Sequence, residues 1–95
     1  MAIDTTQALA LVKTRLNRLP GDTTLDEYLS IRIDGAITEL EATGIHLENN
    51  PNDLMLVVDY AVYQYQNRDK PGGMPDWLRL RRRERWIHQE RGDGS

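Results

Sequence analysis

Cysteine and phenylalanine are both absent from this sequence of 95 residues. The lack of cysteine excludes disulfides, thiol nucleophiles and cysteine-bound metals, and it fits a reducing compartment. Long apolar stretches are missing too, and none reaches the ~20 residues that a membrane-spanning helix needs. We therefore expect no membrane partner. One small domain with a thin core is predicted, and such a domain must pack efficiently or share surface with partners.

Residues suited to catalysis are few. The two histidines, His46 and His88, are far apart in sequence, and neither has another ligand at the i, i+4 spacing of a helical metal pair. The two serines, Ser30 and Ser95, have no nearby base. No enzyme activity, metal or cofactor is therefore expected.

Charge is unevenly distributed along the chain. Residues 1–67 carry 4 basic and 10 acidic side chains, a net charge of −6, whereas residues 68–95 carry 8 and 5, a net charge of +3. The sum is −3. Such a dipolar chain suggests contact with oppositely charged surfaces, either nucleic acid or copies of itself.

Four helical segments are predicted, without strand-like alternation between them. The first runs from about Thr5 to Leu19, with Asp4, Thr5 or Thr6 as its cap and Pro20 as its stop. Its apolar face comprises Leu9, Val12, Leu16 and Leu19.

The second segment begins near Thr24, which has Glu27 at the spacing of a capping box, and ends at Gly44. Its apolar stripe comprises Leu25, Leu29, Ile33, Ala36, Ile37 and Leu40. Ile31 falls off this stripe. It is either a single exposed apolar side chain or a contact for a partner.

The third segment has the clearest start, because Asn50 can cap it, Pro51 fits the first turn and Asp53 favours the positive helix end. Apolar residues then follow at helical spacing, and they are Leu54, Val57, Val58, Ala61, Val62 and Tyr65. This wide apolar face predicts the central helix of the core.

Residues 5–67 are thus the predicted core, residues 68–73 a hinge, residues 75–90 a C-terminal helix that is extended or mobile, and residues 91–95 a flexible tail. On the last helix, one face carries Trp77, Leu80, Glu84 and Ile87, with Leu78 to one side. The segment from Arg79 to Arg85 contains five arginines. These arginines either pair with acidic groups, within the chain or on a neighbouring subunit, or they contact nucleic acid.

Three motifs carry a resemblance to a known family. They are Asn-Pro-Asn-Asp-Leu at the start of the third helix, Tyr63-x-x-x-Asn67-Arg68 at its end, and Met74-Pro75 before the last helix. In this order, over about residues 5–90, the chain resembles the small head–tail connector, or head-completion adaptor, proteins of tailed bacteriophages and prophages.

The resemblance implies an all-α bundle that assembles as a ring, twelvefold in the virion, beneath the portal. The ring would join capsid to tail and extend the DNA channel, with the portal protein and the next neck or stopper protein as partners. The protein would lie in the virion neck, and in the host cytoplasm during assembly.

By the same resemblance the last helix is the element that docks on the portal. The expected docking residues are Trp77, Leu78, Arg81, Arg82, Arg85 and Trp86. Contact with a neighbouring subunit, or non-specific contact with packaged DNA, is expected from Arg79, Arg83, Tyr60 and Tyr63. The alternative function is a small nucleic-acid-binding module that uses the arginine-rich helix, although a dedicated binder usually has an isoelectric point above about 9, and that of this chain is 5.3.

Overall fold

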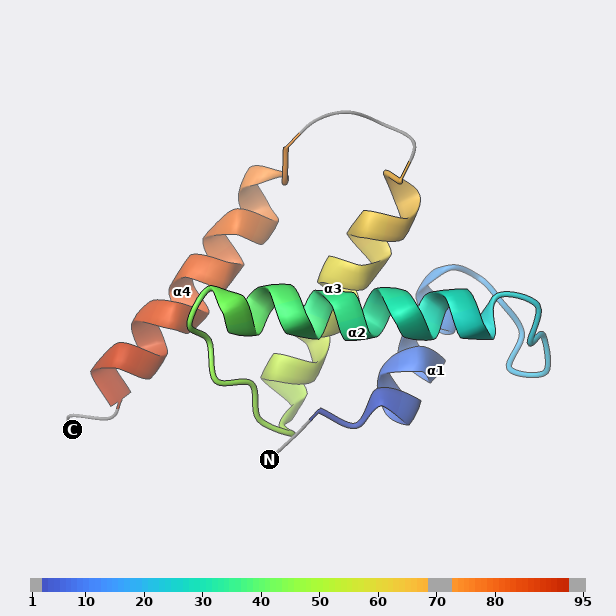
Figure 1. The fold of residues 1–95 in the computed structure, drawn as a ribbon, viewed down its shortest axis with the longest axis horizontal. Coiled ribbons are helices and arrows are strands. Elements are labelled where there is room, and N and C mark those ends of the chain that lie inside the picture. The colour runs from blue at the N-terminus through green and yellow to red at the C-terminus, as the bar shows by residue number, and fades with distance from the viewer. Residues whose placement is uncertain (1–2, 69–72, 93–95) are drawn as a thin grey trace.

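Four helices form the part of the chain that the computed structural model describes, namely residues 3–68 and 73–92, with side chains as far as residue 89. They are α1 (Thr5–Arg15), α2 (Asp26–Ala42), α3 (Pro51–Gln66) and α4 (Asp76–Gly92). Helix α2 crosses in front of α3, and α1 and α4 lie on either side of α3 (Figure 1). The all-α prediction is confirmed, and none of the described helices is long and apolar enough to cross a membrane.

Helix α3 is the centre of the fold because it packs against each of the other three helices. It begins as predicted, since the Asn50 side chain accepts a hydrogen bond from the Asp53 backbone N–H at 2.8 Å. Five of the six predicted core residues of α3 are buried, and Tyr65 packs on the core while partly exposed. Two acidic residues, Asp53 and Asp59, are also buried on this helix.

Helix α1 ends four residues earlier than predicted. Asn17 takes a left-handed conformation with φ of 61°, and the N–H groups of Arg18 and Asn17 donate to the carbonyls of Lys13 and Thr14. This Schellman pattern satisfies the last carbonyls before Pro20 can act as the stop. The predicted place of Leu19 on the apolar face is wrong, because it lies beyond the helix and is 74% exposed.

Helix α2 begins near the predicted position, but the predicted capping box does not form. The Asp22 side chain accepts from the Thr24 N–H instead, and no side chain caps the first turn of the helix. At the other end Gly44, with φ of 98°, ends the helix as predicted. The predicted stripe is buried or partly buried throughout.

Helix α4 packs on the core through a different side from the one that carries Trp77, Leu80 and Glu84. The only fully buried apolar side chain among its described residues is Leu78, whereas Trp77 and Leu80 are 50% and 55% exposed. The helix extends to Gly92, so residues 91–92 of the predicted tail are helical. Residues 93–95, and residues 69–72 of the predicted hinge, lie outside the described part of the chain.

Candidate interaction surface on α4

Helix α4 has an inward polar face and an outward apolar and basic face. The inward face carries Leu78, Arg81, Arg85 and Gln89, which recur every three or four residues and therefore line up along one side of a helix. Leu78 is the single apolar anchor of this face. The other three side chains make hydrogen bonds to groups elsewhere in the chain, so α4 is attached to the core mainly by polar contacts.

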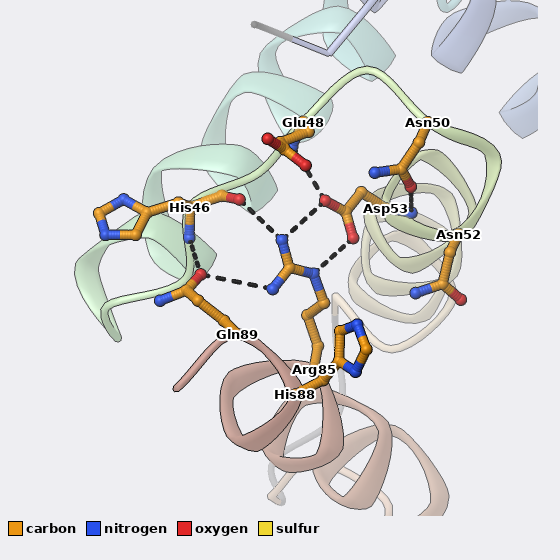
Figure 2. A pocket seen from close by; sticks show the side chains of 8 residues that line it. All are labelled: His46, Glu48, Asn50, Asn52, Asp53, Arg85, His88 and Gln89. Carbon is orange, nitrogen blue, oxygen red and sulfur yellow. Dashed lines mark hydrogen bonds and ion pairs between the residues drawn. The ribbon is translucent and has the colours of Figure 1, made fainter. Parts of the chain in front are cut away.

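The strongest of these contacts joins Arg85 to Asp53, whose side chain is 1% exposed. The Arg85 guanidinium donates from Nε to one carboxylate oxygen at 2.6 Å and from a terminal nitrogen to the other at 3.0 Å. The same terminal nitrogen donates to the His46 carbonyl at 2.8 Å (Figure 2). A forked pair of this kind is among the strongest ionic contacts in proteins. It fixes the C-terminal half of α4 to the N-terminal turn of α3.

Gln89 extends this attachment to the loop after α2. Its side-chain oxygen accepts from the His46 N–H at 2.6 Å, and its amide nitrogen donates to the Gly44 carbonyl at 2.7 Å. The Asp53 carboxylate meanwhile accepts from the Glu48 N–H at 2.9 Å. The loop of residues 44–48 is thus held between α3 and α4 by side chains that bond its backbone groups.

Burial alone would raise the pKa of Asp53, because the charged carboxylate loses its water. The hydrogen bonds from Arg85 and from the Glu48 N–H outweigh this effect, together with the positive charge of the guanidinium, and they hold the pKa of Asp53 below its ordinary value. The hydrogen bond to Asp53 likewise raises the pKa of Arg85 despite its burial. Both groups are therefore charged at neutral pH.

Asp59 is the second buried acid, and it joins three helices. One of its oxygens accepts from Arg15 on α1 and the other from Arg81 on α4. Both arginines are partly exposed, so solvent weakens these pairs relative to the pair at Asp53. Arg81 and Arg85 therefore neutralise the acids that α3 buries, which is the intramolecular form of the acidic pairing expected from the sequence.

The pocket of Figure 2, about 460 Å³ in volume, surrounds the Arg85–Asp53 pair. Its two histidines, His46 and His88, line opposite parts of the rim, and the His46 ring points away from the guanidinium. Among the described residues, no three side chains of the metal-ligating type lie close enough to hold a metal ion. Since Arg85 and Asp53 satisfy each other, the arrangement supports the attachment of α4, and we assign no chemistry to it.

The outward side of α4 is available to partners. Trp77 and Leu80 are half exposed, and Trp77 also lines a shallow pocket against α1 and α3. A separate open pocket of about 300 Å³ lies on another flank of α4. The lining of that pocket consists of Arg79, Arg82, Arg83 and Trp86 from α4 and Thr43 from the end of α2. Trp86 is 42% exposed, and its indole lies close to Gly44.

The ten site residues predicted from the sequence thus separate by position. Leu78, Arg81 and Arg85 face the chain's own core, whereas Trp77, Arg79, Arg83 and Trp86 are exposed and Arg82 is half-buried, as is Tyr63. Tyr60 is buried. Asp53, Asp59 and Gln89 were not predicted as partners from the sequence. For the two acids the available signal was their position within the most apolar helix.

Two tyrosines of α3 have their hydroxyls engaged within the chain. The Tyr63 hydroxyl donates to the Gly73 carbonyl at 2.7 Å. Burial raises the pKa of Tyr60 to about 12, with a further contribution from Glu39, while the nearby Arg82 opposes it. Tyr60 is therefore a neutral core residue at physiological pH and does not offer its hydroxyl to solvent.

Comparisons with known proteins give no relative. No protein-family model, no curated protein and no solved structure matches the chain. The function is therefore inferred from the site and from the resemblance of the sequence motifs.

Proposed function

We propose that this protein is a structural component of virion assembly, a head–tail connector that forms a ring under the portal of a tailed phage and joins capsid to tail. In this role the protein is not an enzyme and needs no cofactor. The observation that supports the proposal most is the outward face of α4, where two large apolar side chains, Trp77 and Leu80, are half exposed. Exposed aromatic residues beside arginines are typical of the energetic centres of protein interfaces.

The attachment of α4 fits a docking element. Its inward face has one buried apolar side chain, Leu78, and otherwise polar contacts, so the helix adds little to the apolar core. Of the six expected docking residues, Trp77, Arg82 and Trp86 can meet the portal protein with α4 in its present position. Of the other three, Leu78 is buried and Arg85 nearly so, and Arg81 is partly exposed but paired with Asp59.

The assembly role can be tested in the phage or prophage whose genome encodes the chain. Deletion of the gene should yield heads and tails that fail to join, and the wild-type gene supplied in trans should restore joined particles. A Trp77→Ala, Leu80→Ala variant should fold normally yet fail to restore them, because it removes only exposed side chains.

The matched control is Leu19→Ala, which removes an exposed apolar side chain that lies outside α4. It should restore joining like the wild type. Joined particles in the deletion strain would refute the connector role, and normal joining by the α4 variant would refute the docking face.

A nucleic-acid-binding module remains the second candidate, because Arg79, Arg82 and Arg83 surround the exposed Trp86. Guanidinium groups bind phosphates, and an indole can stack on a base. Residues 1–67, with a net charge of −6, would oppose the approach of DNA to a monomer.

Fluorescence anisotropy with labelled oligonucleotides, at roughly 0.15 M salt, separates the two candidates. A connector monomer should show no saturable binding. Saturable binding that is lost when the three arginines of the pocket are replaced by alanine would favour the nucleic-acid module.

A further inference from the structure

A row of exposed residues on α2 is complementary in charge and in size to the pocket lined by Arg79, Arg82, Arg83, Trp86 and Thr43, which we call the arginine–tryptophan pocket. This row comprises Glu27, Ile31, Asp34, Thr38 and Glu41, all exposed and all on the side of the helix opposite the buried stripe. Ile31 is 62% exposed, and acids stand one turn before and one turn after it. None of the three acids of the row forms an ion pair with another described side chain.

The pocket offers the complementary features. Its volume of about 300 Å³ equals that of roughly ten water molecules at about 30 Å³ each, which is larger than the four-carbon side chain of isoleucine. Trp86 and the side chains of three arginines line it. Arg79 and Arg83 are both exposed, and the Arg79 guanidinium also pairs with the exposed Asp76 at 2.9 Å, a contact that solvent weakens. Arg83 has no ion-pair partner among the described side chains.

Ile31 cannot fill the pocket of its own molecule. The pocket includes Thr43, the residue that caps the C-terminal end of α2, and twelve residues of helix separate it from Ile31. At a rise of 1.5 Å per residue this separation is roughly 18 Å. A knob and a complementary pocket at different places on one molecule form a heterologous contact, which closes a ring or extends a chain.

We propose that the occupant of the arginine–tryptophan pocket is Ile31 of a second copy of this chain, with Glu27 and Asp34 of that copy placed against Arg79 and Arg83. This contact deepens the assembly role proposed above and rests on it, since it names the surfaces through which copies join. The proposed contact uses the side of α4 that carries Arg79, Arg83 and Trp86. It leaves Trp77 and Leu80, which we call the outward ridge, for another partner.

Sedimentation velocity over a concentration series of the full chain tests the contact. The wild type should self-associate, and two variants should each weaken association by roughly tenfold or more. Ile31→Gln replaces the apolar side chain that would fill the pocket (the knob) without adding charge. The double variant Arg79→Glu, Arg83→Glu reverses the charge at the pocket. All three positions are exposed, so the thermal unfolding midpoints should stay close to the wild type.

Mixing provides the sharpest result. An equimolar mixture of the two variants contains one intact knob and one intact pocket, so it should form dimers and nothing larger. Leu19→Gln and Arg68→Glu, which alter an exposed apolar residue and an exposed arginine elsewhere, should associate like the wild type. The ridge variant Trp77→Ala, Leu80→Ala should also associate normally.

Four outcomes would refute the proposed contact. The wild type could stay monomeric at every concentration, or the variants could associate like the wild type. The mixture could form no dimer, or the pocket variant could lose only oligonucleotide binding. A failure here is distinguishable from failure of the connector role, because that role is measured by the joining of heads and tails. Normal joining by both contact variants, with unchanged association, would refute the contact alone.

Discussion

Replacement of Arg85 by methionine keeps an unbranched side chain but removes the guanidinium, and it leaves the Asp53 carboxylate without its ionic partner. The carboxylate is 1% exposed and the Arg85 side chain 10%, so solvent screens this pair little. Removal of one member of a buried pair typically costs about 3–5 kcal/mol. A domain of this size has a free energy of unfolding of about 5–15 kcal/mol in total. The variant should therefore lose a large share of its stability, with an unfolding midpoint about 12–40 °C lower.

Detachment of α4 sets an upper limit on this loss. Once α4 leaves, water reaches Asp53 and relieves the cost of burying its unpaired charge, at the expense of the α4 contacts. Burial of Leu78, worth about 1.5–3 kcal/mol, is the main apolar part of those contacts. A measured loss near the lower end of the range, with a changed tryptophan fluorescence signal from Trp86, would indicate this route.

Urea unfolding followed by circular dichroism measures the effect, and a double-mutant cycle isolates it. Asn at position 53 keeps an oxygen that can accept from the Glu48 N–H, so Asp53→Asn, Arg85→Met should be more stable than Arg85→Met by roughly 1–3 kcal/mol. Arg83→Met, on the outward face, should change stability by less than about 0.5 kcal/mol. If Arg85→Met is equally neutral, or if the double variant is no more stable than the single one, the structural role of the pair is refuted.

Acid should weaken the fold through Asp53, because its pKa is lowered in the folded chain from an ordinary value of 3.8. The stabilisation is complete above that value and is lost as the pH falls through the folded pKa, so urea midpoints of the wild type and of Asp53→Asn should converge in this acidic range. Gly44→Ala should cost about 1–2 kcal/mol in a thermal melt, since φ is 98° there and the added methyl carbon would lie 3.2 Å from the Trp86 indole nitrogen; an unchanged melt would contradict this. Val58→Asp should unfold the domain by burying a charge in α3, and a dichroism spectrum like that of the wild type would contradict its central position.

The sequence predicted most reliably the features that depend on neighbouring residues. The start of α3 follows from Asn50 and Pro51, and the end of α2 follows from Gly44, because caps and turns act within a few positions. The burial of α3 follows from a helical period that lies within one segment.

The orientation of α4 could not be predicted in this way, because it depends on groups distant in sequence. Its apolar residues Trp77 and Leu80 are half exposed, while the inward face carries arginines. These arginines are turned inward by Asp53 and Asp59, which lie 32 and 22 positions away from their respective partners. Periodicity assumes that buried residues are apolar, and that assumption fails where a helix covers buried acids.

The polar attachment of α4 also determines how its release would register in thermodynamic measurements. The heat capacity change and the denaturant dependence of a transition scale with the surface that it exposes. Release of α4 exposes Leu78 and the part of α3 that α4 covers, whereas global unfolding exposes the whole cluster around α3. Detachment would therefore contribute little to a calorimetric trace, and it would register instead as hydrogen exchange of the α4 amides through an opening that denaturant barely promotes.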